Sequence, residues 1–184
     1  MSSASLALAD LKPGVWVIDP VYSEIGFTIR HLMTKIRGVF TEFSGAITVA
    51  APLADSTVTA EIQVASLDTH STTRDNHVIS GEILDTANFP RIRFAGTGID
   101  LHGASGTLHG ELTVKDVTSP VTLEVEFNGV SPDPWGGTRA GFSATTTITR
   151  RQFGVEWEIP LQGDRALLGD KIDITIEVQC VYRP

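Results

Sequence analysis

Residues 121–127 read VTLEVEF, and every second residue in this stretch is apolar. The apolar residues at 121, 123, 125 and 127 fall on one side of an extended chain, and Thr122, Glu124 and Glu126 fall on the other. Because successive side chains of a strand point to opposite faces, this period of two predicts a β-strand with one buried and one solvated face. Such strands are typical of antiparallel sheets.

The same alternation recurs along the chain, for example in EIGFTIRH (24–31), STVTAEIQV (56–64) and DITIEVQCV (173–181). It predicts about eight strands. They are expected near Trp16–His31, Val39–Val49, Ser56–Val64, Arg91–Asp100, Thr107–Val114, Thr118–Val130, Arg139–Thr149 and Lys171–Tyr182. Strands of this kind form either a sandwich or a closed up-and-down barrel, and a barrel of this size can hold one small ligand.

Composition limits the classes of protein to consider. A chain of 184 residues with a mean hydropathy of +0.08 fits one folded domain. We expect a flexible segment at 1–14 and one domain over 15–184. The net charge of −8 argues against a nucleic-acid partner, since phosphate binding needs a surplus of basic residues. Cys180 is the only cysteine, so no intrachain disulfide is possible, and we expect it in the core.

The N-terminal sequence MSSASLALADLKPG has no charged region before its short apolar run, unlike a secretory signal peptide. No stretch approaches the ~18 apolar residues of a membrane-spanning helix. The sequence therefore predicts a cytoplasmic protein without stable insertion in a membrane.

The segment STTRDNHVISGEILD (71–85) interrupts the series of strands. Ser71, Thr72 or Thr73 is suited to cap a helix that has Asp75 in its first turn. We therefore expect a short helical insert around residues 72–86, lying across one mouth of a barrel.

Alternation also predicts which side chains face the interior. Those expected to contact a ligand are Phe27, Ile29, Ile62, Phe94, Leu112, Phe127 and Phe142. Gly110 and Ala144 are small residues at inward positions. The volume they leave is either part of a ligand cavity or space for a bulky side chain from another strand.

Four ordered segments carry a resemblance to a known family: YSEIGFTIRHLMTKIRGVFTEFSGAI (22–47), SLDTHSTTRDNHVISGEILDTANFPRIRF (66–94), HGELTVKDVTSPVTLEV (109–125) and FSATTTITRRQFGVEW (142–157). They resemble the YceI-like, polyisoprenoid-binding proteins, and the likeness runs from about Trp16 to Val178. It implies a lipocalin-like antiparallel barrel of eight strands with a helical insert. It also implies a long apolar pocket for a polyisoprenoid, a quinone precursor or a similar lipid, with no cofactor and often a homodimer.

The chain departs from the family pattern at three places. Tyr22-Ser23 stands where the family usually has His-Ser, Val78 stands where it has Leu, and SGEILD (80–85) lacks two aromatic residues of the corresponding family segment. Since the loss of the aromatic residues is expected near the mouth, it bears on the shape of the ligand.

The charged cluster Arg74-Asp75-Asn76-His77 has three interpretations. It pins the insert onto the barrel, or it also donates hydrogen bonds to the polar head of a ligand with the help of His31, or it belongs to a metal or catalytic site. His70 and His77 are seven residues apart, which matches no usual metal spacing. Phe153 and Trp157 line either the pocket or a dimer face.

These patterns together predict a protein that carries or sequesters a long apolar molecule. Two alternatives stay open. The first is a cofactor-independent isomerase or cyclase acting in the same cavity, which would need a strongly perturbed ionisable residue deep in the barrel. The second is a scaffold whose barrel is filled by its own side chains.

Overall fold

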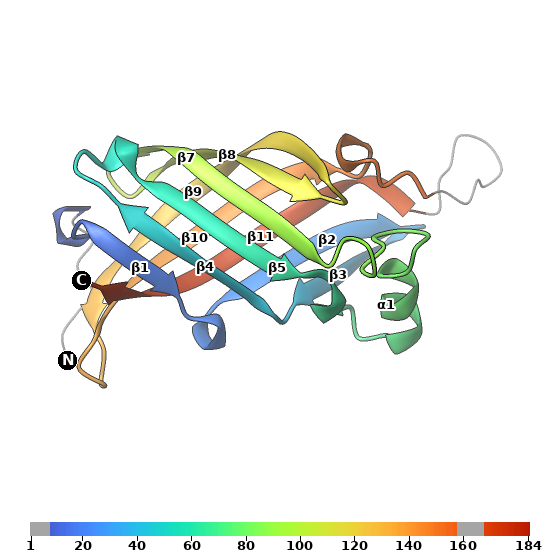
Figure 1. Cartoon of the computed structure of the whole chain (residues 1–184), viewed down its shortest axis with the longest axis horizontal. Helices are drawn as coiled ribbons and strands as arrows, with labels where there is room; N and C mark the ends of the chain where they lie inside the picture. The colour runs from blue at the N-terminus through green and yellow to red at the C-terminus, as the bar shows by residue number, and fades with distance from the viewer. Residues whose placement is uncertain (1–7, 158–167) are drawn as a thin grey trace.

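Antiparallel strands build nearly all of the protein, which the computed structural model describes over residues 8–157 and 168–184 (Figure 1). The strands are β1 (Gly14–Ile18), β2 (Glu24–His31), β3 (Thr34–Phe40), β4 (Phe43–Val49), β5 (Thr57–Gln63), β6 (Leu67–Asp68), β7 (Arg91–His102), β8 (Ser105–Val114), β9 (Val117–Pro132), β10 (Thr138–Thr149) and β11 (Leu168–Arg183).

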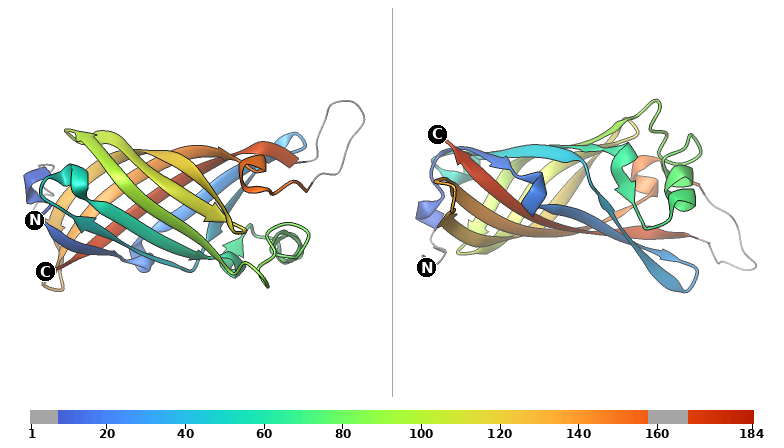
Figure 2. Two further views of the ribbon diagram at one scale, coloured as in Figure 1. Left: turned by 45° about the horizontal axis from the view of Figure 1, so that its top comes forward. Right: turned by 90° about the horizontal axis from the view of Figure 1, so that it is seen from below.

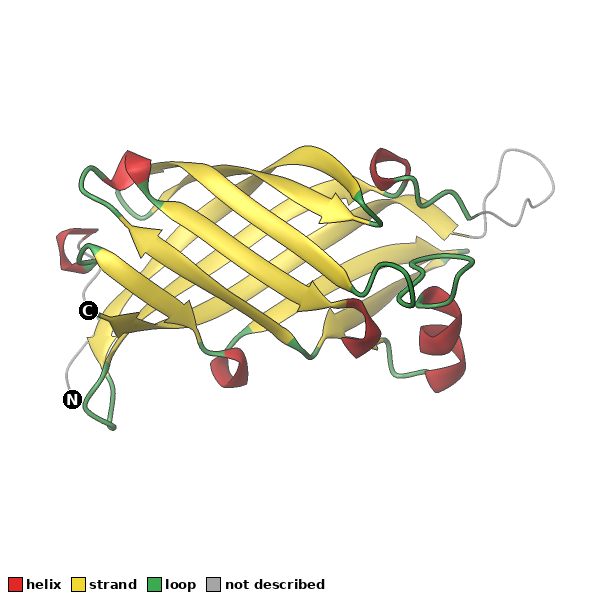
Figure 3. Cartoon of the chain, in the orientation of Figure 1, coloured by secondary structure: helices red, strands yellow, loops and turns green. Residues whose placement is uncertain are grey.

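Helical segments lie at the ends and margins of the strand wall (Figure 3). Over the described ranges there is one α-helix, α1 (Thr72–Val78). The short 3-10 segments are η1 (Leu8–Asp10), η2 (Pro20–Tyr22), η3 (Leu53–Asp55), η4 (Val64–Ser66) and η5 (Arg151–Phe153). No helix in these ranges is long and apolar enough to cross a membrane.

The sheet closes because β11 pairs first with β2 and then, farther along, with β1. β1 and β2 are therefore two parts of one strand, and β3–β4 and β5–β6 are likewise split strands. With β7 to β11 they make the closed eight-stranded antiparallel barrel that the sequence predicted. The first strand breaks at Pro20, which has no N–H to donate, and the Asp19 carboxylate caps the break by accepting from the Val21 N–H at 3.0 Å.

Several strand boundaries differ from expectation. The second strand was predicted from Val39, but β3 already begins at Thr34 and forms a hairpin with β2. Basic residues and Gly38 hide the alternation there.

Between β8 and β9, the sequence KDVTSP (115–120) holds a turn of only two residues, Lys115 and Asp116. Both have positive φ (50° and 64°), as a tight hairpin requires.

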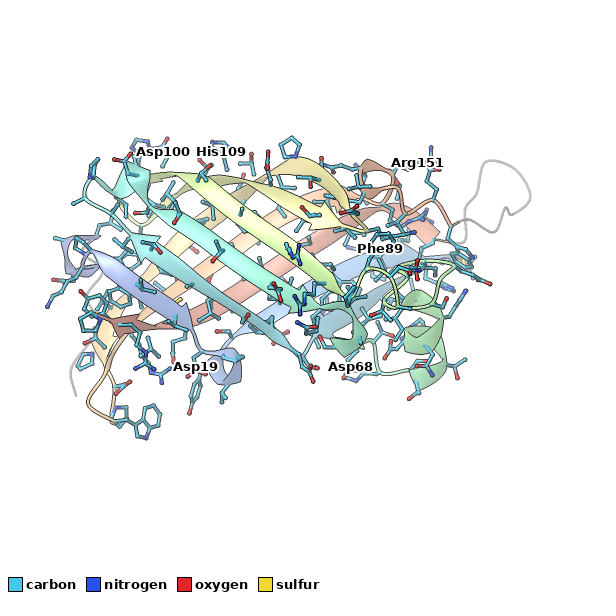
Figure 4. All side chains as sticks on the ribbon, viewed as in Figure 1. Asp19, Asp68, Phe89, Asp100, His109 and Arg151 are labelled. Atoms are coloured by element: carbon cyan, nitrogen blue, oxygen red, sulfur yellow. The ribbon has the colours of Figure 1, made fainter. Side chains whose placement is uncertain are left out.

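Buried side chains gather at the two ends of the barrel. At the terminal end, where β11 finishes and η1 lies, Trp16, Phe127, Ala140 and Cys180 belong to one cluster. Cys180 is fully buried, as predicted, and burial raises the pKa of its thiol to about 12. At the α1 end a second cluster includes Val64, Ile83, Ile92, Phe153 and Val155. Figure 4 shows Asp68 and Arg151 toward the α1 end, and Asp19 and Asp100 toward the terminal end.

The predicted helical insert is present between β6 and β7. The Ser71 hydroxyl accepts from the Arg74 N–H at 3.3 Å, so Ser71 is the cap. The α-helix ends at Val78, and residues 80–88 form turns, so the helix covers only the first part of the expected insert at 72–86. The chain folds back there because the Leu84 N–H donates to the Val78 carbonyl at 2.9 Å, and this brings Ile83 into the buried cluster at the α1 end.

Candidate ligand cavity

A cavity of about 410 Å³ occupies the barrel interior. Its lining extends from Leu11 at the terminal end to His77 and Trp157 at the α1 end. This volume lies in the range of small-molecule sites, which run from about 300 to 1,000 Å³.

Inward-facing side chains from every strand of the barrel make most of the cavity wall apolar. Examples along its length are Ile18, Ile47, Val58, Phe94, Leu112, Leu123, Phe142, Ile148, Ile174 and Val178. The strand period explains this lining, because the inward residue of each pair is apolar and its neighbour faces solvent. Such a wall binds hydrocarbon by removing it from water, at about 25 cal/mol per Å² of apolar surface.

Small residues play both of the roles that the sequence allowed. A Cβ at Gly110 would lie 2.6 Å from the Phe94 ring, so the space beside Gly110 belongs to that ring. Gly38 similarly admits the Phe27 ring, with which an added Cβ would collide. Ala144 instead lines the cavity directly.

Polar lining residues come from the half of the barrel nearest α1. They are His31, Thr69, Arg74, His77, Thr146, Thr149 and Arg150. Thr146 and Thr149 lie near the C-terminal end of the strand β10, and His31 is the last residue of β2. Arg74 and His77 lie on α1. The cavity is therefore amphipathic along its axis, with an apolar body and polar groups at one end.

Arg74 is held by the segment that leads into its own helix. Its Nε donates to the Thr69 hydroxyl at 2.7 Å, and its Nη2 donates to the Thr69 carbonyl. Asp75 accepts from the N–H and the hydroxyl of the same Thr69, at 3.0 Å for the N–H. Over the described residues, Nη1 of Arg74 has no hydrogen-bond partner. The guanidinium is thus fixed in orientation while one terminal nitrogen stays free to donate.

His77 connects α1 to the chain after β10. Its ring packs edge-on against Trp157, with 5.0 Å between the ring centroids, and its Nε2 lies 2.7 Å from an oxygen of Glu82. The ring contact joins α1 to the chain after β10 at this end of the cavity, which both side chains line. The predicted lid position of the insert therefore agrees with its contacts.

Arg150 is 4% exposed, and its guanidinium binds backbone carbonyls at the α1 end of the cavity. Its guanidinium donates to the carbonyls of Gly169 (2.8 Å), Trp157 (2.9 Å) and Val155 (3.1 Å). A buried guanidinium saturated by carbonyls fixes irregular backbone that has no strand partner. It therefore holds the segment after η5 against the start of β11.

Comparison with known proteins identifies this architecture. The model of the YceI-like domain matches residues 16–180. The chain belongs to the YceI-like family. It is 35% identical to Protein YceI of Escherichia coli O6:H1, over 99% of this chain and 92% of the relative. It is 34% identical to a UPF0312 protein of Pseudomonas syringae pv. tomato, over 85% of this chain and 84% of the relative.

Solved structures share the YceI-like barrel. The Campylobacter jejuni YCEI protein is 26% identical and aligns with a TM-score of 0.70, covering 85% of this chain and 91% of that one. Burkholderia cenocepacia BcnA aligns with a TM-score of 0.77 at 21% identity, over 88% of this chain and 98% of that one. A polyisoprenoid binding domain from Saccharophagus degradans aligns with a TM-score of 0.70 at 10% identity, over 91% and 98% respectively. The last two likenesses concern the fold alone.

The cavity of this YceI-like barrel brings most of the predicted site residues together. Its lining includes Phe27, Ile29, His31, Ile62, Arg74, His77, Phe94, Leu112, Phe142, Phe153 and Trp157. Phe127 lies outside the lining. It is 2% exposed and packs on Phe142, with 5.4 Å between ring centroids, in the cluster at the terminal end. Phe127 keeps the inward phase of its strand and pairs with Phe142, but its ring is used in packing within that cluster.

Sequence reasoning missed several lining residues. Thr69 and Arg150 lie outside regular strands, and Ile36 lies on a strand segment that the pattern did not predict. No group of three or more metal-ligating side chains gathers within residues 8–157 and 168–184. The predicted cluster Arg74–His77 divides between roles, because Arg74 and His77 line the cavity while Asn76 is exposed.

Proposed function

We propose that the protein binds one long apolar molecule inside the barrel and carries or sequesters it. The ligand class is a polyisoprenoid, a quinone precursor or a similar lipid. The observation that carries this proposal is the polarity of the cavity, which is apolar along its length and polar at the α1 end. An amphipathic lipid would lie with its chain toward Leu11 and its head toward Arg74.

The fold of the neighbours supports this class of ligand. The Saccharophagus degradans domain, described as polyisoprenoid binding, has the same barrel. An isoprenoid chain would gain most of its affinity from apolar burial, while the free Nη1 of Arg74 offers a donor to a phosphate or carbonyl oxygen. His31 and His77 are further donors at the same end.

The cavity favours binding over catalysis. General acid–base chemistry needs an ionisable group in contact with the reacting atoms. Over the described residues the ionisable lining groups are His31, Arg74, His77 and Arg150, all at the α1 end, and Arg150 is occupied by carbonyls. The homodimer and the cytoplasmic location expected from the sequence remain predictions.

The proposal is tested by organic extraction and mass spectrometry of protein purified without detergent. We expect a stoichiometric lipid. Ala144→Phe places a ring in the cavity and should abolish lipid recovery, whereas Thr145→Phe adds the same ring on the solvated face and should not change it. The absence of lipid from several expression hosts, together with no uptake of an added polyprenyl diphosphate, would overturn the proposal.

A further inference from the structure

The β2–β3 hairpin exposes an apolar tip at the α1 end of the barrel. Leu32 is 41% exposed and Met33 is 94% exposed. In the right-hand view of Figure 2 this hairpin runs past the rest of the barrel wall and diverges from α1. Large apolar side chains at such a tip are not explained by packing within the chain.

Basic residues surround this tip. Arg30, Lys35 and Arg37 are all exposed, and no acidic residue occurs from Ile25 to Thr41. Arg30 also stiffens the turn, because its Nη1 donates to the Leu32 carbonyl at 2.8 Å. None of the three is within ion-pair distance of a carboxylate in the part of the chain that the structure describes. Nearby carboxylates do have partners: Asp68 faces His70, Glu82 faces His77 and Asp170 faces Arg151.

The inner face of the same hairpin is cavity wall. Ile29, His31 and Ile36 line the cavity, while the basic residues alternate to the outside. On the side of β3 away from β2, only Val39 and Phe40 pair with a strand, β6. The hairpin thus joins the exposed tip to the cavity wall, with the pair His31 and Thr34 between the tip and the apolar residues Ile29 and Ile36.

We propose that the β2–β3 hairpin docks the open end of the barrel on an anionic lipid membrane, so that the ligand passes between bilayer and cavity. This rests on the proposed lipid-binding function. An exposed apolar tip inserts at the boundary of headgroups and acyl chains, and the flanking cations meet anionic headgroups. A protein partner would be matched by a broader apolar patch than this narrow tip provides.

The net charge of −8 does not oppose docking in this orientation. At physiological ionic strength a charge acts over about 8 Å, so only the groups nearest the bilayer count. On the hairpin those groups are Arg30, Lys35 and Arg37, whereas the carboxylates of the same end lie on other segments, each beside a basic side chain or a histidine: Asp68 on β6, Glu82 after α1 and Asp170 on β11. The contact is therefore orientation-specific and weakens as salt is added.

Flotation of the full chain with vesicles tests this proposal. Vesicles of phosphatidylcholine with phosphatidylglycerol should bind the protein, and pure phosphatidylcholine should bind it far less. The double variant Lys35→Glu/Arg37→Glu should lose about tenfold or more in vesicle affinity. The matched variant Lys12→Glu/Arg183→Glu changes net charge equally but lies at the terminal end, and should bind as the wild type does.

A second pair isolates the apolar tip. Met33→Ser should weaken vesicle binding, while Val21→Ser removes an exposed apolar residue (80% exposed) away from the mouth and should not. The docking proposal would be overturned if the protein did not bind anionic vesicles. It would also be overturned if a hairpin variant and its matched control reduced vesicle binding equally.

The two proposals fail in different ways. Uptake of a fluorescent polyprenyl ligand from solution should be normal in Lys35→Glu/Arg37→Glu, since neither side chain lines the cavity. Uptake from anionic vesicles should be slowed in the same variant. Normal uptake from solution without vesicle binding would refute docking alone, whereas vesicle binding without any uptake would refute lipid carriage.

Discussion

The two ends of the barrel use arginine in opposite ways. At the terminal end, Arg139 donates to Asp19 at 2.8 Å, to Asp133 at 2.9 Å and to Gln179 at 3.1 Å. Its guanidinium also lies 5.4 Å from the centre of the Tyr22 ring. At the α1 end, the guanidinium of Arg74, which lines the cavity, is oriented by Thr69 alone, and its Nη1 has no hydrogen-bond partner among the described residues.

The difference in pairing suits Arg139 to stabilising the fold and Arg74 to binding a ligand. Arg139 is an element of the wall, because it ties the break between β1 and β2 to β10 and β11. Arg74 is fixed well enough to be ready for a ligand but is not saturated. The buried cluster beneath Arg139 closes the barrel, whereas the cluster beneath α1 is interrupted by polar side chains at the mouth.

The largest effect should come from removing the central side chain of the terminal end. Trp16 is fully buried, stacks on Tyr182 with 4.7 Å between centroids, and donates to the Lys12 carbonyl at 2.9 Å. Trp16→Ala should lower the free energy of unfolding by about 3–5 kcal/mol, measured by urea denaturation with circular dichroism.

Trp157→Ala is the matched change at the α1 end. Trp157 is only half-buried, so the loss of stability should be about 1 kcal/mol, but the capacity to bind a polyprenyl ligand should fall. Equal losses of stability from the two substitutions would show that the ends do not divide their roles.

Arg139 should give a smaller, pH-dependent effect. A hydrogen bond from Arg139 lowers the pKa of Asp19, and the pKa of Asp133 is lowered first by the Gly137 N–H and then by Arg139. Carboxyls with lowered pKa values stabilise the fold above their ordinary value of 3.8 and lose this contribution as pH falls through the folded-state values. Arg139→Met should therefore destabilise the protein most near neutral pH.

The measurement compares urea midpoints of Arg139→Met and wild type from neutral to acid pH. The gap should narrow below pH 3.8 as both carboxyls become protonated. A gap that stays constant across this range would mean that Arg139 acts through packing on Tyr22 and Trp135 rather than through its carboxylate partners.

Alternation predicted the strands because it is a local property of each strand, whereas the choice of a closed barrel over a sandwich came from the family resemblance. Val121 to Phe127 shows this, since Thr122, Glu124 and Glu126 are exposed as expected. The pattern failed where the local signal is weak, since Thr34–Gly38, with two basic residues and a glycine, was not predicted as a strand. Alternation also cannot tell an inward side chain that lines the cavity from one that packs in the core, so Phe127 was predicted to contact the ligand, whereas it belongs to the buried cluster of the terminal end.

The polar end of the cavity was predicted in part. Arg74 and His77 stood out because charge is rare between apolar strands, and the Ser71 cap predicted the helix that carries them. Arg150 was missed because its carbonyl partners include Leu168 and Gly169, which only the folded chain brings to it, and Thr69 was missed because its contacts with Arg74 and Asp75 depend on how the chain turns into α1. No sequence pattern around Thr69 or Arg150 predicts these contacts.

The smallest effect should come from Arg74→Ala, and it should depend on the ligand. If the free Nη1 meets a polar head, the variant should lose about tenfold in affinity for an isoprenoid diphosphate, the usual scale for a hydrogen bond to a charged group. Affinity for the hydrocarbon of the same chain length should hardly change, because burial along the strands is untouched.

Arg91→Ala is the control, since Arg91 is at the same end but pairs with Glu61 on the outside. Fluorescence titration of both ligands measures the difference. Equal losses for the two ligands would return Arg74 to a purely structural role like that of Arg139, and the two ends would then differ only in how completely their arginines are paired.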